Sequence, residues 1–363
     1  MSQLWDRPLR MMRWDYMDDF SRIKHENLES LAKMKKEKLH INCEWIVGTP
    51  GAAPGLGYLT TFQAEGFERY PGFEDFDSLR SYVPYAHQYG IKLLVYLNMH
   101  WFSYDFAKAH PDWEQITSGG DPYGKIHPLY GNGTTFCVNS PWRDWAFRLI
   151  EETMKTGVDG VFLDGPVIYP DCCYCSHCQE KFKDRYSREI PKEDWQDPLW
   201  KEFIEFREDS MAHFLHDAQN AVVGINPEGV IFLNAGSWQP GGWRVAREAK
   251  RLARYQNFSL AEAFFHPFPG RHNLYASAMT TKYLRATGKP AVTAFHYCMG
   301  PWHYTFLTPQ EMKLSVFQAV GCGGNIWIGG ATYRHEFNPG GCSPLHETLG
   351  FLEENDDVFT DLR

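Results

Sequence analysis

Short apolar runs alternate with amphipathic stretches along the whole chain. Each apolar run of about five to eight residues is typical of a buried strand. We predict strands over residues 9–16, 40–48, 91–98, 157–164, 230–234, 259–265, 290–297 and 325–329. Apolar side chains at helical spacing, such as Leu28, Leu31 and Met34, predict helices over residues 25–38, 76–89, 142–156, 179–188, 199–223, 243–255, 273–287, 308–320 and 344–354. Thr308 is expected to cap the helix after it, with Pro309 at the first helical position.

Alternating strands and helices predict an α/β fold with a parallel sheet. Eight such units in 363 residues fit a (β/α)8 TIM barrel that forms a single domain over residues 1–363. Long loops after its strands are expected at about residues 49–72, 102–140 and 165–178. A doubly wound open sheet is the alternative, and it usually carries a glycine-rich turn after its first strand. The corresponding residues, Trp14 to Asp18, contain no glycine, which favours the barrel.

Polar residues mark the ends of the predicted strands. In barrel enzymes the active site lies at the C-terminal ends of the strands, and a strand buried on both faces avoids polar residues unless they are used. Seven of the eight strands have such residues: Asp15, Glu44, Asn98 with His100, Asp164, Asn234, Glu262 and His296. For any single histidine, a structural role is the ordinary interpretation.

Aromatic residues make up 16% of the chain and are frequent in the loops after the predicted strands. Polar groups beneath aromatic walls suit a sugar, because its hydroxyls lie around the ring and its C–H groups point above it. The sequence therefore predicts a carbohydrate-binding mouth. Its predicted substrate-binding residues are Asp15, Glu44, Asn98, His100, Trp101, Asn234, Trp238, His296 and Trp302.

Two carboxyl groups are needed to cleave a glycosidic bond, one to protonate the leaving oxygen and one to attack or to activate water. We assign Asp164 as the nucleophile, or as the base of an inverting enzyme, and Glu262 as the acid/base. Both lie on buried strands, the fourth and the sixth, which face each other across part of the barrel mouth. A turn residue is the structural alternative for Asp164, and a salt-bridged acid is the alternative for Glu262.

Cysteines are concentrated just after the predicted fourth strand, where Cys173, Cys175 and Cys178 are spaced to bind one ion. A fourth ligand would complete a tetrahedral structural zinc site. Cys137 is the preferred donor, and Cys172 or His177 are the alternatives. Free thiols, or an iron–sulfur cluster on Cys172, Cys175 and Cys178, remain open. No organic cofactor is predicted.

Three segments resemble the hypothetical glycosyl hydrolase barrels: residues 136–143, residues 159–165, and the cysteine loop with Phe182. These barrels are distant relatives of the zinc-containing β-galactosidases of glycoside hydrolase family 42 and of the α-L-fucosidases. The galactosidase resemblance implies zinc on Cys137, Cys173, Cys175 and Cys178. It also implies catalytic glutamates after strands four and seven, whereas this chain has Asp164 after strand four and no acid in strand seven. An aspartate nucleophile is instead similar to the fucosidase type, whose acid/base often follows strand six, as Glu262 does.

The net charge of −9 argues against nucleic acid and anionic membranes as partners. The N-terminus does not resemble a signal peptide, and no apolar run approaches the ~18 residues of a membrane helix. We therefore expect a cytoplasmic protein with a carbohydrate substrate. The sequence leaves open whether it forms a homo-oligomer.

The predicted function is a glycoside hydrolase that acts on the chain end of an oligosaccharide or on a small glycoside. Two alternatives stay open. One is a carbohydrate-binding barrel without catalysis, and the other is a sugar isomerase or lyase that uses a histidine base such as His100 or His296.

Overall fold

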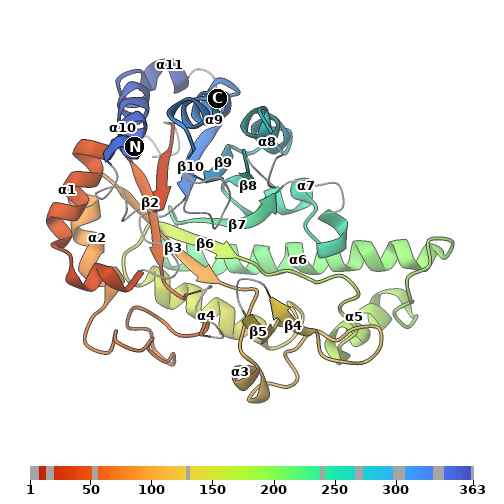
Figure 1. Cartoon of the computed structure of the whole chain (residues 1–363). Helices are drawn as coiled ribbons and strands as arrows, with labels where there is room; N and C mark the ends of the chain where they lie inside the picture. The colour runs from red at the N-terminus through yellow and green to blue at the C-terminus, as the bar shows by residue number, and fades with distance from the viewer. Residues whose placement is uncertain are drawn as a thin grey trace.

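The computed structural model describes residues 8–13, 20–50, 56–127, 131–237, 242–265, 273–296, 307–329 and 339–360. Within these ranges, parallel strands close into a barrel in the order β1-β10-β9-β8-β7-β6-β3-β2 (Figure 1). The barrel strands are β1 (Arg10–Arg13), β2 (Cys43–Val47), β3 (Lys92–Asn98), β6 (Gly160–Asp164), β7 (Val230–Ser237), β8 (Ser259–Ala263), β9 (Ala291–His296) and β10 (Asn325–Gly329). The predicted (β/α)8 TIM barrel is confirmed.

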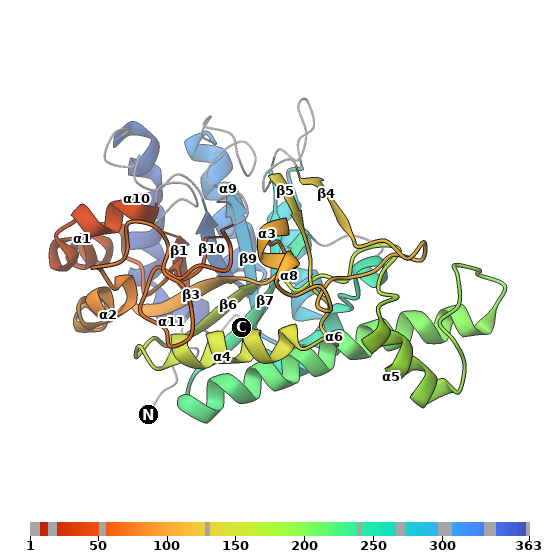
Figure 2. The ribbon, with the colours of Figure 1, turned by 90° about the horizontal axis from the view of Figure 1, so that it is seen from below.

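Helices surround the barrel on its outside (Figures 1 and 2). The longer ones are α1 (Leu28–Leu39), α2 (Ser78–Gln88), α4 (Trp142–Met154), α5 (Ser176–Tyr186), α6 (Pro198–Ile225), α8 (Ala276–Arg285), α9 (Pro309–Gly321) and α10 (Pro339–Glu354). The shorter ones are α3 (Tyr104–Lys108), α7 (Ala249–Leu252), α11 (Asp356–Thr360) and the 3₁₀ turns η2 (Phe20–His25), η3 (Gly242–Val245) and η4 (Ala253–Tyr255). None of the described helices has the length and apolarity needed to cross a bilayer.

Aromatic rings fill the barrel interior, because alternate residues of each strand point inward. Trp45 of β2 stacks on Tyr96 of β3 with ring centroids 5.1 Å apart, and Phe162 of β6 lies 5.5 Å from Trp45. Trp327 of β10 reaches the same cluster from the opposite wall, 5.3 Å from Phe162. We call these four residues the aromatic floor, since the strands end just above them.

The start of α9 agrees with the predicted cap, whereas two other segments differ from the predicted elements. The Thr308 side chain accepts from Glu311 N–H while Glu311 accepts from Thr308 N–H, a complete capping box with Pro309 in the first turn. The helix predicted over residues 243–255 is instead broken into η3, α7 and η4. A hairpin of β4 (Gly124–His127) and β5 (Gly131–Thr134) lies within the loop predicted to be irregular over residues 102–140.

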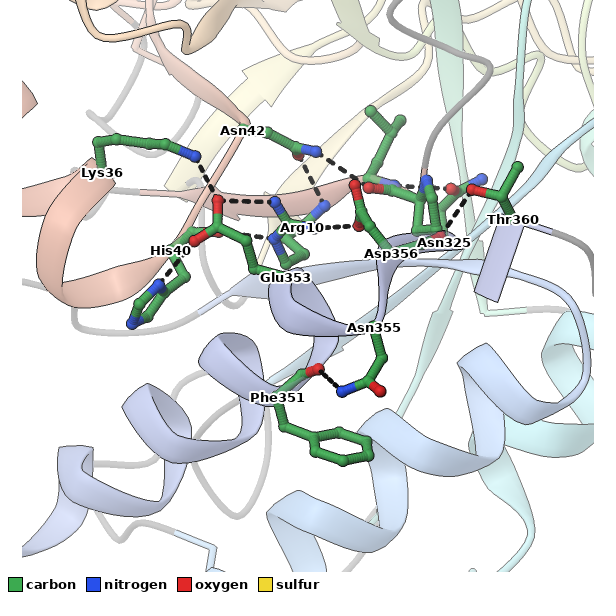
Figure 3. Close-up of polar contacts among 12 residues, drawn as sticks. Arg10, Lys36, His40, Asn42, Asn325, Phe351, Glu353, Asn355, Asp356 and Thr360 are labelled. Carbon is green, nitrogen blue, oxygen red and sulfur yellow. Dashed lines mark hydrogen bonds and ion pairs between the residues drawn. The ribbon is translucent and has the colours of Figure 1, made fainter. Parts of the chain in front are cut away.

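A cluster of charges joins the first strand to the last helices (Figure 3). Arg10, only 3% exposed, donates to Glu353 at 3.3 Å and also pairs with Asp356. Glu353 receives further bonds from Lys36 of α1 and from His40 Nδ1, the latter at 2.8 Å. Burial raises the pKa of Glu353, but the Lys36 and His40 bonds and the Arg10 charge outweigh it, so the net pKa is lowered. These contacts tie β1 and α1 to α10 and α11.

We expect Glu353→Gln to lower the free energy of unfolding by about 1–2 kcal/mol at pH 7. The folded-state pKa of Glu353 is below the ordinary value of about 4.3, so its charge stabilises the fold above that pH. This contribution is lost as pH falls through the folded-state pKa, and the difference between the variant and the wild type should shrink there. Urea unfolding at pH 7 and at acidic pH measures both effects.

Glu189→Gln is the matched control, because Glu189 pairs with Lys183 while both side chains are about two-thirds exposed. Such a pair contributes about 0.5 kcal/mol or less. Equal destabilisation by the two variants would contradict a specific role for the cluster around Arg10 and Glu353.

Candidate active site at the barrel mouth

Asp164 is the last residue of β6, and its side chain faces the barrel interior. Phe162 belongs to the aromatic floor, and residues two apart on a strand share a face. Asp164 is 8% exposed. It is therefore a nearly buried carboxylate at the C-terminal end of a barrel strand, where barrel enzymes place their catalytic groups.

Neighbouring strands orient the Asp164 carboxylate through both of its oxygens. The Tyr96 hydroxyl of β3 donates to Oδ2 at 2.6 Å, and Asn234 Nδ2 of β7 donates to Oδ1 at 3.0 Å. His100 Nδ1 lies 2.7 Å from the Asp164 carbonyl oxygen. Because a carbonyl oxygen only accepts, Nδ1 carries the proton. The predicted residues Asn234 and His100 thus lie beside Asp164.

Glu262 faces the same interior from β8. Its neighbour Ala261 packs against Leu284 of α8 on the helix side, so Glu262 points the other way. Glu262 is partly exposed and pairs in register with Ser237 of β7 and Ala294 of β9. Asp164 and Glu262 thus lie on strands separated by β7.

Arg247 is a positive charge close to both carboxylates. It lies between η3 and α7, and its Nε and Nη2 donate to the Pro166 carbonyl oxygen at 3.3 and 3.0 Å. Burial lowers the pKa of Arg247, while the charges of Asp164 and Glu262 act to raise it. The Arg247 guanidinium therefore does two things. It holds the turn behind Asp164 through the Pro166 carbonyl, and it is attracted by both carboxylates.

Two predicted binding residues support the mouth rather than line it. Asn98 is fully buried, and its Nδ2 donates to the carbonyl oxygens of Trp101 at 2.8 Å and Gly57 at 3.3 Å. Trp101 is 1% exposed and packs edge-on against Tyr169, with centroids 6.2 Å apart. Their predicted sugar contact is therefore replaced by a role in holding the loop after β3.

Glu44 is not part of the mouth. It is the second residue of β2, it is fully buried, and it pairs with Lys35 of α1. Lys35 also donates to the Tyr82 hydroxyl of α2 at 3.0 Å. The predicted substrate contact of Glu44 is wrong, because the neighbouring Trp45 occupies the interior and Glu44 faces the helices.

Some predicted site residues fall outside the described ranges. They are Asp15, Trp238 and Trp302, together with the side chain of His296, whose backbone ends β9.

Two side chains hold the loop that follows Asp164. Gln115 Nε2 donates to the Val167 carbonyl at 2.6 Å, and Gln115 Oε1 accepts from Tyr169 N–H at 3.0 Å. Arg207 of α6, only 3% exposed, donates to the carbonyls of Ile168 and Tyr169 at 3.1 and 3.0 Å. The backbone next to Asp164 is thus fixed from two directions.

Four buried cysteines converge at the far end of the same loop. The sulfur atoms of Cys137, Cys173, Cys175 and Cys178 all lie within 4.8 Å of one another and form no disulfide. Tetrahedral zinc with bonds of about 2.3 Å would place its sulfurs roughly 3.8 Å apart, so the group fits such an ion. Cys172 and His177, the alternative donors, are not members of this group.

Asn139 orders the cysteine group. Its backbone N–H donates to Cys137 Sγ and its Nδ2 to Cys178 Sγ, both at 3.3 Å. Lys181 Nζ donates to Asn139 Oδ1 at 3.1 Å. Donors to sulfur around a ligand set are typical of the outer shell of a metal site.

Tyr96→Phe should lower kcat about 10- to 100-fold, because one Asp164 oxygen loses a donor that contributes about 1.5–3 kcal/mol. The measurement is kcat on a substrate that the wild type turns over. Tyr82→Phe is the control, since it removes a buried hydroxyl bond outside the barrel. Equal kcat losses in both variants would contradict a specific role for Tyr96.

Comparisons with known proteins agree with this architecture. Residues 27–165 match the model of the family Hypothetical glycosyl hydrolase 6, a segment that includes Asp164 and stops before Glu262. No curated protein sequence matches the chain significantly.

Solved glycosidase structures share the fold at low sequence identity. The PgaB (BpsB) glycoside hydrolase domain from Bordetella bronchiseptica has a TM-score of 0.74 at 12% identity, covering 94% of this chain and 98% of that chain. Alpha-L-fucosidase isoenzyme 2 from Paenibacillus thiaminolyticus has a TM-score of 0.70 at 17% identity, covering 97% and 50%. A beta-galactosidase from Bacillus circulans sp. alkalophilus has a TM-score of 0.70 at 16% identity, covering 98% and 57%.

The chain thus spans 50% and 57% of the fucosidase and galactosidase chains, and likeness at this identity establishes the fold alone. The predicted resemblance to the hypothetical glycosyl hydrolases is confirmed, and the matched region includes two of the three segments on which it was based, residues 136–143 and 159–165. The chain folds as a TIM barrel, and its residues 27–165 match the model of the family Hypothetical glycosyl hydrolase 6.

Proposed function

We propose that the protein hydrolyses O-glycosidic bonds with Asp164 and Glu262. The observation that carries this proposal is the Asp164 carboxylate, which is nearly buried, faces the interior at the end of β6, and is oriented by Tyr96 and Asn234. A carboxylate held by a donor on each oxygen is placed to act without rearrangement. The family match over this strand supports the same activity.

Asp164 is the nucleophile, or the base that activates water in an inverting reaction. Glu262 is the acid that protonates the leaving oxygen. It is more exposed than Asp164 and faces the interior from β8. This exposure suits a group that exchanges a proton with water after each turnover.

Arg247 and Asn234 would position the reacting groups. Arg247 fixes the Pro166 carbonyl behind Asp164 and places a positive charge near both carboxylates. Asn234 holds the second Asp164 oxygen. Together they keep the Asp164 side chain from turning away when a substrate enters.

The proposed substrate is the chain end of an oligosaccharide or a small glycoside. The wider set of sugar contacts includes His100, Asn234, His296, Asp15, Trp238 and Trp302. An enclosed carboxylate within a barrel mouth favours a terminal sugar over the middle of a long chain.

We further propose that Cys137, Cys173, Cys175 and Cys178 hold a structural zinc ion. Four thiol ligands leave no open position for a substrate. The ion would supply rigidity alone, since Cys173 and Cys175 belong to the loop that begins directly after Asp164.

A panel of aryl α- and β-glycosides, followed by mass spectrometry of the products, tests the proposal. Hydrolysis adds one water to the combined product mass, whereas isomerisation leaves that mass unchanged. Binding of sugars without any turnover would contradict the proposal and favour a carbohydrate-binding barrel. Rearranged products of equal mass would favour an isomerase or lyase.

A further inference from the structure

A concave site on the outside of the barrel is lined by residues of the loop after β2, of the segment that contains α3, and of the first turns of α4. Figure 2 shows α3 and α4 on the outer side of the strands. The volume of this site is about 600 Å³, within the roughly 300–1,000 Å³ of small-ligand sites. We call it the α4 groove, and its lining residues are Tyr58, Gly66, Phe67, Glu68, Phe106, His110, Trp113, Pro141, Asp144, Trp145 and Arg148.

Stacked aromatic rings form the walls of the α4 groove. Tyr58 lies flat on Phe106, with centroids 4.2 Å apart and an angle of 3°. His110 lies flat on Trp113, with centroids 3.7 Å apart and an angle of 7°. Phe67 packs edge-on against Trp145 at 5.3 Å. Ring pairs locked in this way present rigid apolar faces at little cost in side-chain entropy.

Polar groups at the rim of the groove are not engaged by the protein. Within the described ranges, the side chains of Glu68, Asp144 and Arg148 make no hydrogen bond or ion pair with another residue. Arg148 only lies over the Phe67 ring, 5.8 Å from its centroid. Burial lowers the pKa of His110, so its imidazole is neutral at pH 7 and offers one donor and one acceptor.

The aromatic walls and the charged groups at the rim together favour one class of ligand over others. An apolar ligand would strip water from two carboxylates and a guanidinium without replacing their hydrogen bonds. An anionic ligand would meet repulsion from Glu68 and Asp144. A neutral sugar offers hydroxyls that donate to carboxylates and accept from Arg148, and its C–H face can lie on the aromatic rings.

We propose that the α4 groove is a second, non-catalytic carbohydrate site that binds a neutral pyranose of an oligosaccharide. Its lining residues do not overlap with those that contact Asp164. The groove would hold a glycan on the outer wall of the barrel, independently of cleavage at the mouth.

The test needs a spectroscopic signal that reports binding in the α4 groove and not at the barrel mouth. Protein carrying Asp164→Asn is labelled with 5-fluorotryptophan, and the Trp113 fluorine signal is assigned with Trp113→Phe. Cellopentaose, mannopentaose, xylopentaose, maltopentaose and chitopentaose are titrated separately. At least one of them should shift the Trp113 signal to saturation.

The rim variant Asp144→Ala/Arg148→Ala should weaken that binding at least about tenfold, because both side chains are exposed and their loss leaves the fold intact. Lys155→Ala, on an exposed position of the same segment outside the groove, should leave the affinity unchanged. When the same two rim substitutions are made in protein that keeps Asp164, the hydrolysis of aryl glycosides should equal that of the wild type.

Two results would overturn the α4 groove as a sugar site. One is that none of the five pentaoses moves the Trp113 signal. The other is that the rim variant saturates at the same sugar concentration as the parent. Neither result depends on turnover at Asp164, so failure of this proposal is distinguishable from failure of the proposed hydrolase.

Discussion

Asp164→Asn should reduce kcat on any glycoside that the wild type hydrolyses by at least about a thousandfold. Asparagine keeps the size and shape of the side chain but removes the negative charge. An amide neither attacks an anomeric carbon effectively nor takes a proton from water. The measurement is kcat at saturating aryl glycoside, with the thermal midpoint recorded for both proteins.

The geometry around Asp164 predicts that the variant still folds. The asparagine side chain has a single oxygen, which can accept from Tyr96 or from Asn234. Whichever of these two donors is not bonded to it loses its acceptor. The cost is about 1–3 kcal/mol, which a barrel of this size tolerates. A small fall in thermal midpoint with a very large fall in kcat would separate chemistry from stability.

Asp171→Asn is the matched control, because Asp171 is exposed on the same loop seven positions beyond Asp164. Its backbone is in the left-handed region, at a φ of 61°, which asparagine also accepts. This variant should retain wild-type kcat. If Asp164→Asn kept more than a tenth of the activity, Asp164 would have to be removed from the proposed mechanism.

The strand pattern predicted the barrel well because parallel barrel strands are buried on both faces and read as unbroken apolar runs. Most predicted boundaries lie within a few residues of the observed ones. The β4–β5 hairpin was missed because its strands have four residues each and are rich in glycine. Segments of that kind carry no periodicity long enough to distinguish a strand from a loop.

The site was less predictable than the fold, because successive side chains of a strand point to opposite faces of the sheet. An error of one position therefore moves a residue from the barrel interior to the helix side. Glu44 looked like a strand-end acid, but a shift of one position from Trp45 turns it towards the helices and Lys35. The same alternation could have identified Tyr96, which shares a face with Asn98 and Phe162 through the barrel register. The alternation of side chains along the strand is enough to place Tyr96 on the same face as Asn98.

Other site residues depend on contacts between distant segments. Arg247 reaches Pro166 across 81 positions, and Arg207 reaches Ile168 across 39 positions. Neither lies in a motif, and only the folded chain brings them to the Asp164 loop. Cys137 was predicted as a partner of the cysteine loop, and the structure does place its sulfur in that group.

The purified protein should contain about one zinc ion per chain, measured by plasma mass spectrometry, and Cys173→Ser should lose it. Removing one of four thiolates breaks a closed structural site whose binding energy is part of the folding energy. Cys137, Cys175 and Cys178 are buried, so this variant leaves three buried thiols without their shared ion. We expect the thermal midpoint to fall by about 5–10 °C, which corresponds to a few kcal/mol in a chain of this size.

Cys172→Ser provides a control one residue away. Cys172 is also buried, but its sulfur is outside the group formed by Cys137, Cys173, Cys175 and Cys178. This variant should keep its zinc, although burying a hydroxyl in place of a thiol costs some stability. Iron in place of zinc, or loss of the metal from Cys172→Ser as well, would favour an iron–sulfur cluster on Cys172, Cys175 and Cys178.

Absence of any metal from the wild type would leave four reduced thiols, and chelation would then have no effect on the thermal midpoint. In the zinc-bound protein, by contrast, a chelator should lower both the midpoint and kcat, because the loop held by the ion begins at the residue after Asp164.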